Sequence, residues 1–238
     1  MGDGSLDADA LAHAAARLLP VDGVGITVLV DDLRLPLGAS SLVMQRAEEL
    51  QTTLGEGPCL AAAEARTAVR ADLPELLRRW PLYGTEILRQ TPYRSAASVP
   101  LRTSDGQIFA ALDLMSEEPQ VSHRLNLDEV DRGIGTPLGA LLDMCMRPIR
   151  DADGIEVLPE WYERATARRH DVWTAVGMVM GYLHQSGSDA LSLLRQYAYS
   201  HDLDLDLVAA EVVARRLPVQ NLLGRAARRP EDGPRAAC

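Results

Sequence analysis

Apolar and polar positions follow two different periods in the first part of the chain. Apolar residues at steps of three and four predict helices, which fall at 6–19, 42–54, just after Pro58, at 74–90 with interruptions at Pro81 and Gly84, and at 125–146. Short β-rich runs bounded by Gly, Asp or Pro predict strands, which fall at 24–30, 34–41, 68–73 and on both sides of the Ser104-Asp105-Gly106 turn in 95–116. Helices mixed with hairpins indicate an α+β domain with a mainly antiparallel sheet.

The period changes in the second part of the chain. Residues 148–160 hold two prolines, a glycine and several charges, a composition typical of a linker. From Trp161 to Leu217 only a helical period is present, and it predicts three helices, the second with Ser188 as its N-cap. Residues 218–238 offer little apolar surface and are predicted to be a disordered tail. The predicted organisation is therefore an α+β domain at 1–147, the linker, a helical domain at 161–217 and the tail.

The first helix of the helical domain carries two apolar stripes. One is a heptad seam suited to pairing with a second copy, formed by Tyr162, Ala165, Arg169, Val172, Val176, Val179 and Leu183. The other lies beside it and is formed by Trp173, Gly177, Met180 and His184. We predict that this helix pairs in a homodimer and also packs on its own domain.

Composition restricts the classes of function. The longest apolar run has nine residues, too few to span a bilayer, and the acidic start lacks the basic residues of a signal peptide, so a cytoplasmic protein without membrane association is expected. The net charge of -10 argues against coating nucleic acid by bulk attraction, so any nucleic-acid surface must be local. Cys59, Cys145 and Cys238 lack metal-ligand spacing, which predicts reduced thiols and no zinc site.

The stretch "AVGMVMGYLHQSGSDALSLLRQYAYSHDLDLDLVAAEVV" holds a spaced set of small, apolar and basic residues: Ala175, Gly177, Met180, Ala190, Leu194, Arg195, Ala198 and Leu207-Val208-Ala209. With this set the chain resembles the ANTAR domain over nearly all of 161–217. The resemblance implies a three-helix module that binds paired hairpins in nascent RNA and prevents transcription termination. Together with the chemistry of phosphate and base recognition it assigns RNA contacts to Arg168, Arg169, Ala175, Gly177, Arg195 and Tyr199.

Two positions depart from the family pattern. Val176 stands where the family usually has Lys, and Asp202 stands where it usually has Asn, and both changes remove affinity for phosphate or base edges. A second explanation exists for the other residues: Ala175 and Gly177 also suit a close crossing of helices, and an exposed Arg195 also suits a solvated surface.

"LGEGPC", "PLYGTEILRQ" and the hairpin over 95–116 resemble the GAF fold across about residues 6–146. The resemblance implies a six-stranded antiparallel sheet, helices on its faces and a small-molecule pocket, and a GAF domain followed by ANTAR is the order in bacterial antitermination regulators. Pocket candidates are Cys59, Trp80, Tyr83 and Tyr93. Cys59 is interpreted mainly as a buried apolar residue, with redox sensing or ligand contact as alternatives, and the aromatic residues either line the pocket or fill the core.

The pattern assigns neither a ligand nor a cofactor. Leu60 follows Cys59 where bilin-binding GAF domains have His, and no catalytic motif is present, so we predict a protein that is not an enzyme. The predicted function is a signal-responsive RNA-binding regulator of antitermination whose partners are RNA hairpins and an unknown small molecule. The alternatives are a small-molecule or redox sensor that acts through protein partners with little RNA affinity, and a reductase acting at Cys59.

Overall fold

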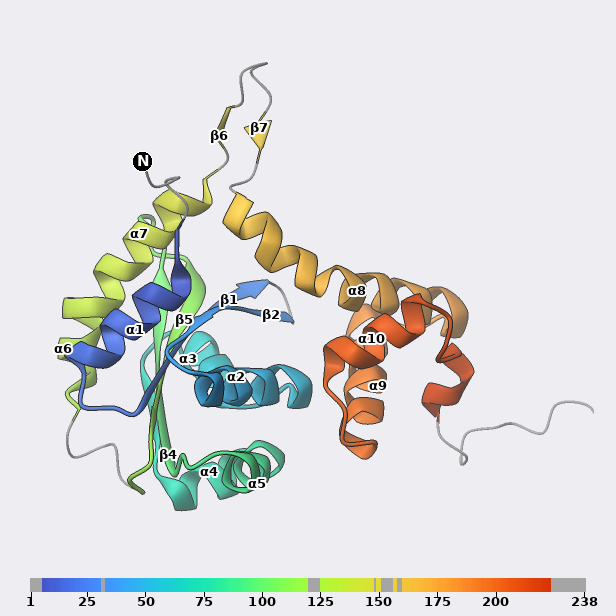
Figure 1. Cartoon of the computed structure of the whole chain (residues 1–238), viewed down its shortest axis with the longest axis horizontal. Helices are drawn as coiled ribbons and strands as arrows, with labels where there is room; N and C mark the ends of the chain where they lie inside the picture. Colours follow the sequence, from blue (N-terminus) through green and yellow to red (C-terminus); the bar gives the residue numbers. More distant parts are fainter. Residues whose placement is uncertain are drawn as a thin grey trace, which may run out of the picture. The chain divides into compact units, whose positions relative to one another are not determined.

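The computed structural model describes residues 6–30, 33–119, 125–147, 149–150, 156–157 and 160–223. The chain divides into two compact units, Met1–Arg169 and His170–Cys238. The division falls inside α8 (Glu160–Leu183), the helix that we predicted to open the helical domain (Figure 1). None of the helices in the described ranges has the length and apolar character needed to cross a bilayer.

The first unit is organised around a five-stranded antiparallel sheet with the order β2-β1-β5-β4-β3 (Figure 1). Its strands are β1 (Gly23–Val30), β2 (Leu33–Ala39), β3 (Val69–Ala71), β4 (Ser95–Arg102) and β5 (Ile108–Ser116). Every predicted strand is confirmed, and both predicted hairpins form. The expectation of six strands in this sheet is wrong for the described residues, which form five strands, with β2 and β3 at the two edges.

The helices of the first unit follow their local signals. They are α1 (Ala8–Leu18), α2 (Leu42–Leu54), α3 (Pro58–Ala65), α4 (Leu73–Arg79), α5 (Pro81–Gln90), α6 (Leu127–Val130), the π-helical turn η1 (Asp131–Gly135) and α7 (Thr136–Met146). Ser41 caps α2 by accepting a hydrogen bond from the backbone N–H of Met44, and Gly55 ends it in the left-handed conformation. The stretch predicted at 74–90 divides at Trp80 because Pro81 begins a new helix, whereas Gly84 lies inside α5 and interrupts nothing.

The sheet separates two apolar cores. One joins its outer face to α1, α6 and α7 and includes Ala12, Val24, Ile26, Val28, Val99, Leu112, Leu114, Leu138 and Leu142. The other joins the opposite face to α2, α4 and α5 and includes Met44, Ala47, Leu50, Leu76, Tyr83, Ile87, Ala96 and Met115. Because side chains alternate along a strand, odd and even positions of β1, β4 and β5 serve different cores.

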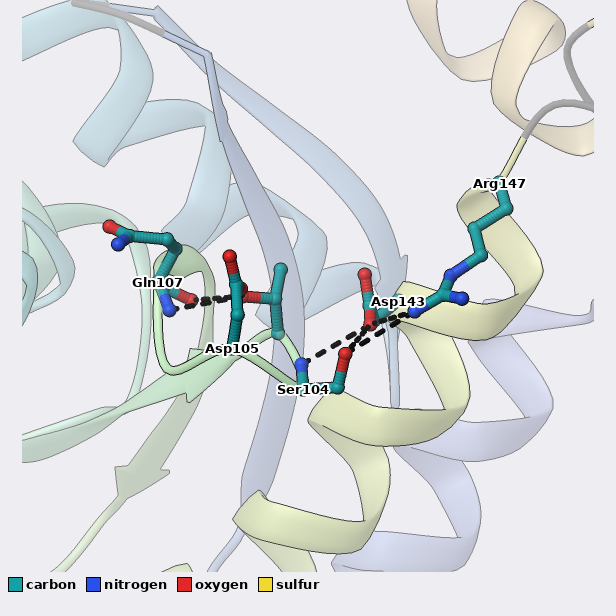
Figure 2. Close-up of polar contacts among 6 residues, drawn as sticks. Ser104, Asp105, Gln107, Asp143 and Arg147 are labelled. Carbon is teal, nitrogen blue, oxygen red and sulfur yellow. Dashed lines mark hydrogen bonds and ion pairs between the residues drawn. The ribbon is translucent and has the colours of Figure 1, made fainter.

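The turn between β4 and β5 is tied to α7 by one carboxylate. The Oδ2 of Asp143 accepts hydrogen bonds from the backbone N–H of Ser104 at 3.2 Å and from its hydroxyl at 3.1 Å (Figure 2). Arg147, one turn further along, donates to the same oxygen at 3.1 Å. Within the turn, the backbone N–H of Gln107 donates to the hydroxyl of Thr103 at 3.0 Å. These contacts fix the end of the hairpin against the last helix of the domain.

The second unit contains the C-terminal part of α8 followed by α9 (Gly187–Ser200), α10 (Leu205–Val213) and the 3-10 helix η2 (Val219–Leu223). The three predicted helices are confirmed. Ser186 rather than Ser188 caps α9, since its hydroxyl accepts from the N–H of Asp189 at 3.2 Å. The predicted tail also begins too early: Val219 and Leu222 are buried and η2 packs against α9. Residues 224–238 lie outside the described residues.

The predicted heptad seam is partly covered by the chain itself. Val172 and Val179 have no exposed surface, and Val176 and Leu183 are half-buried. The neighbouring stripe faces outward instead, with Trp173 and Met180 exposed. The assignment of Val172 and Val179 to a surface between two copies is therefore wrong, because the same three-and-four spacing is used to pack the helix within its own chain. Homodimerisation itself stays a prediction. The side chains of Tyr162, Ala165 and Arg168 are not among those described.

The predicted linker contains regular structure in its described part. β6 (Ile149–Arg150) and β7 (Glu156–Val157) pair as a short antiparallel ladder. Residues 148, 151–155 and 158–159 lie outside the described residues. The segment between the sheet domain and α8 is thus more than an unstructured connection.

A close approach between α7 and β4 gives a test of this architecture. A Cβ atom at Gly139 would lie 2.7 Å from the carbonyl oxygen of Arg102, so Gly139→Ala should force the two backbones apart and lower the free energy of unfolding by about 1–3 kcal/mol. Gly133→Ala is the matched control, because no atom lies within 4 Å of the added methyl group. Urea denaturation of both variants measures the difference. Equal stability of the two would contradict the packing of α7 on β4.

Candidate functional site

Polar side chains gather on the face of the sheet that α2 covers. In β1 the even positions Val24, Ile26 and Val28 enter the outer core, so Thr27 faces α2. The same alternation turns Asp113 of β5 and Ser98 of β4 toward α2, and these two residues are direct partners in the antiparallel register. Three neighbouring strands therefore present polar groups at the centre of an otherwise apolar sheet.

Helix α2 and strand β2 complete this group. Glu48 and Gln51 are three residues apart in α2 and lie on one side of the helix. In β2, Leu35 enters the outer core, so its neighbour Arg34 faces α2. We call this set the buried polar cluster, and its members, each at most 1% exposed, are Thr27, Arg34, Glu48, Gln51, Ser98 and Asp113.

Hydrogen bonds connect most members of the buried polar cluster. Thr27 Oγ1 donates to Glu48 Oε2 at 2.8 Å, and Gln51 Nε2 donates to Asp113 Oδ2 at 3.3 Å. Arg34 donates from Nη1 to the backbone carbonyl of Gln51. These bonds tie the sheet to α2 from three separate strands. Arg34, Thr27 and Asp113 are thus positioned by β2, β1 and β5 respectively.

The absence of a side chain at Gly25 makes room for the carboxyl group of Glu48. Gly25 is the register partner of Asp113, and a Cβ atom there would lie 2.4 Å from Glu48 Oε1. Such a distance is impossible without displacing the carboxyl group. A small residue in the middle of a β-rich run therefore has a specific role in admitting a charged group beneath the sheet.

The two carboxyl groups of the cluster retain a proton. Burial raises the pKa of Glu48 well above its ordinary value, and the charge of Asp113 raises it further. Burial also raises the pKa of Asp113, whose hydrogen bond with Glu48 partly opposes the rise. Both shifts favour the protonated form, and the hydrogen bond between the two groups favours a proton shared by the pair, beside the positive charge of Arg34.

Arg34 keeps two nitrogen atoms without a protein partner. Its Nε and Nη2 are fully enclosed and donate no hydrogen bond within the described structure. An enclosed polar group left without a partner destabilises the fold by roughly 1–3 kcal/mol, more when it is charged. The arrangement therefore suits recognition of a small polar molecule rather than packing alone. Among the described residues no group of three His, Cys, Asp or Glu side chains is placed to hold a metal ion.

Of the predicted pocket residues, Cys59 and Tyr83 adjoin the buried polar cluster. The backbone N–H of Cys59 donates to Gln51 Oε1 at 3.2 Å. Both side chains are fully buried, and burial raises the pKa of the thiol and of the phenol. The charges of Glu48 and Asp113 raise both pKa values further, whereas the charge of Arg34 opposes the rise. Cys59 is accordingly a protonated thiol, as its interpretation as a buried small residue implies.

Trp80 and Tyr93 have a different environment. Both belong to the apolar core between the sheet and helices α2, α4 and α5, as Tyr83 also does, but neither forms a hydrogen bond with a member of the buried polar cluster among the described residues. The Trp80 ring also lies 4.4 Å from the guanidinium carbon of Arg79. The structure thus places these two aromatic side chains in core packing, whereas the polar members of the site come from residues that the sequence pattern did not single out. Asp113, a carboxylate inside the apolar run of β5, was the available signal.

The residues assigned to RNA contact are distributed over buried and exposed positions of α8 and α9. Arg169 and Ala175 are buried, Arg195 is half-buried, and Gly177 and Tyr199 are exposed. Among the described residues no atom lies within 4 Å of a Cβ placed on Gly177, so a close helix crossing within this part of the chain does not explain that glycine. The side chain of Arg168 lies outside the described set.

The two departures from the family pattern also have defined places. Val176 is half-buried on α8. Asp202 follows α9 with a φ of 55°, a left-handed conformation that Asn and Asp tolerate better than other residues with a side chain. The Asp at this position therefore preserves the backbone turn that an Asn would make, while it changes the charge.

The shared proton makes stability depend on pH. A carboxyl group whose pKa is raised on folding holds a proton that the unfolded chain releases, so stability falls as pH rises from the unfolded pKa toward the folded one. Glu48→Gln removes this titration and should flatten the fall by up to about 1.4 kcal/mol per pH unit. Urea denaturation between about pH 5 and 8 measures the slope. Glu64→Gln, at an exposed position of α3, is the control and should match the wild type.

The burial of Cys59 predicts a slow reaction with thiol reagents. In the native protein Cys59 should be alkylated on the order of a hundredfold more slowly than the half-buried Cys145, because only local opening exposes its thiol. Mass spectrometry of the alkylated peptides, before and after denaturation in urea, gives both rates. Rapid native labelling of Cys59 would instead support a redox role.

A family model and several solved structures match the first domain. A comparison with curated proteins finds none that matches. Among solved structures, the chain is similar to the type II free methionine-R-sulfoxide reductase from Thermoplasma acidophilum, with 18% identity and a TM-score of 0.39 over 58% of this chain and 87% of that one. It is also similar to the GAF domain of a two-component sensor histidine kinase from Bacillus halodurans, with 13% identity and a TM-score of 0.39 over 59% and 93%. The model of the GAF domain matches residues 8–146, and the chain therefore belongs to the GAF domain family.

Proposed function

We propose that this protein is a signal-responsive regulator that binds a small molecule in its GAF domain and paired RNA hairpins through its C-terminal helices, and thereby promotes transcription antitermination. The single observation that carries the sensing half is the buried polar cluster, in which Arg34 keeps two donors without a protein partner. A domain that encloses such groups gains stability when a ligand satisfies them.

Binding rather than catalysis fits the chemistry of this site. The best candidate for a catalytic nucleophile, the thiol of Cys59, is buried, and its raised pKa favours the protonated form. The carboxyl groups of Glu48 and Asp113 are equally enclosed and share a proton. A nucleophile needs ionisation and access, and these groups have neither. The proposal therefore describes a sensor and not an enzyme.

Support for the RNA-binding half comes from the resemblance of 161–217 to the ANTAR domain and from the exposed residues of the second unit. Tyr199 is 42% exposed at the end of α9, where its ring can stack on an unpaired base. Gly177 exposes helix backbone on α8 and allows close approach. Arg195 lies on the same helix as Tyr199, one turn earlier, as the basic contact to phosphate.

Helix α8 provides the covalent route between the two functions. It is continuous from Glu160 in the first unit to Leu183 in the second. A change at the N-terminal end of this helix can therefore reach its C-terminal end through the helix itself. Regulation requires that the small molecule bind one arrangement more tightly than the other. Under this proposal the two arrangements are two forms of a homodimer.

A second candidate function is a sensor that acts through protein partners and has little RNA affinity. The observation that favours it is the set of exposed apolar side chains on α8: Trp173, Met180 and Tyr182. The acidic balance of 160–217, with six arginines and eight acidic residues, also favours it. The two functions differ in their dependence on salt, because only phosphate contacts release counterions.

A titration of the purified protein with a tandem-hairpin RNA at several salt concentrations tests the proposal. The wild type should bind, with an affinity that falls steeply as salt rises, and Arg195→Ala should weaken binding and reduce the salt slope by about one. Arg78→Ala, an exposed arginine of α4 in the GAF domain, is the matched control and should bind as the wild type does. Absence of binding at low salt, with and without candidate small molecules, would leave the protein-partner function as the better account.

A further inference from the structure

The guanidinium group of Arg34 forms a hydrogen bond with the protein on one edge and none with the described residues on the other. Nη1 donates to the backbone carbonyl of Gln51, which fixes the position of the group. Nε and Nη2, whose N–H bonds lie side by side on the remaining edge, have no partner among the residues that the structure describes. Two parallel donors of this kind match the two oxygens of a carboxylate, which they bind in bidentate fashion.

The unoccupied edge is not satisfied by the acidic residues nearby. Glu48 and Asp113 lie close enough to influence Arg34 electrostatically, yet neither forms a hydrogen bond with Nε or Nη2. They interact with each other instead, and with Thr27 and Gln51. A fully enclosed arginine beside two carboxyl groups that it does not contact is arranged to bind an anionic group from outside the chain.

The carboxyl groups of Glu48 and Asp113 determine which second functional group a ligand should carry. One oxygen of each carboxyl group, Glu48 Oε1 and Asp113 Oδ1, is enclosed and accepts no hydrogen bond from an N–H or hydroxyl donor among the described residues. A cationic donor placed there gains charge-assisted hydrogen bonds. A phosphate dianion at the fork is disfavoured because Asp113 repels its second charge. The enclosed site therefore favours a molecule that carries one carboxylate and one cationic donor.

We propose that the buried polar cluster binds an α-amino acid, or a small zwitterion with the same two groups. Its carboxylate occupies the Nε and Nη2 edge of Arg34, and its ammonium group lies against the carboxyl groups of Glu48 and Asp113. This ligand class deepens the proposed sensing function and rests on it. Each charged end of the ligand then meets a group of the opposite sign.

Binding of such a ligand changes the proton content of the site. An ammonium group beside the pair makes the shared proton unfavourable, so binding should release it to solvent. The charged or titratable groups that interact with Glu48 among the described residues are Arg34 from β2, Asp113 from β5, Cys59 from α3, Tyr83 from α5 and Tyr93, which precedes β4. Of these, Asp113 is the carboxyl group that forms a hydrogen bond with Glu48. A ligand with a carboxylate and no amino group releases none by this route.

Isothermal titration calorimetry of the full chain with the common L-amino acids tests the inference. At least one should bind at least tenfold more tightly than its matched amine or its matched carboxylic acid, and repetition in buffers of different ionisation enthalpy should show proton release. Arg34→Lys keeps the charge and loses the planar pair of donors, so it should weaken binding at least tenfold. Arg78→Lys, which makes the same exchange at an exposed position, should bind as the wild type does.

Asp113→Asn is a second variant, for the case in which Arg34→Lys does not fold, and it should lose preference for the amino acid over its matched carboxylic acid. Failure of every amino acid to bind the wild type, or binding unchanged in both variants, overturns the inference and leaves enclosed water as the occupant.

A measurement of RNA-hairpin affinity in the presence of the bound amino acid separates this inference from the proposed function. Amino-acid binding without a change in RNA affinity contradicts the proposed regulation alone, whereas a response of RNA affinity to a heated cell extract but to no amino acid contradicts the ligand class alone.

Discussion

The enclosure of Arg34, Glu48 and Asp113 between the sheet and α2 is the constraint on which the GAF domain depends. Charged groups are stable beneath a sheet only when other polar groups surround them, and here Thr27 and Gln51 supply hydrogen bonds from β1 and α2. The opposite face of the same sheet packs an apolar core against α1, α6 and α7. The domain therefore has one core that provides stability and one that combines apolar packing with a charged centre, and the alternation of side chains along each strand keeps them apart.

Much of the fold could be predicted from the sequence because its signals are local. The cap at Ser41, the left-handed Gly55 and the turn at Ser104-Asp105-Gly106 each depend on a few consecutive residues, and each is present in the structure. The buried polar cluster could not be predicted in the same way. Gly25, Ser98 and Asp113 form one row only because β1, β5 and β4 are neighbours, and strand order is not encoded in any short stretch. Asp113 lies inside an apolar run and is thus a local signal of a buried charge, but the sequence does not identify the residues that surround it.

The helical region shows a different limit. The three-and-four spacing correctly predicted helices α8, α9 and α10, but it did not determine what covers their apolar faces. Val172 and Val179 satisfy the geometry of a seam between two copies and equally that of packing within one chain, and the structure uses them within one chain. Periodicity specifies a face and not its partner, because both environments remove the same apolar area from water.

A charged centre with unused donors gives a sensor a large response to its ligand. In the unliganded domain the open edge of Arg34 lowers stability, so the region around α2 and β2 is less stable than an apolar core of the same size would make it. A ligand at a hundred times its dissociation constant adds about 2.7 kcal/mol to the bound form. That free energy acts on the element it contacts, and α2 holds both Glu48 and the carbonyl that anchors Arg34. Under the proposed function, the charges that lower stability without a ligand therefore also define which part of the domain responds to one.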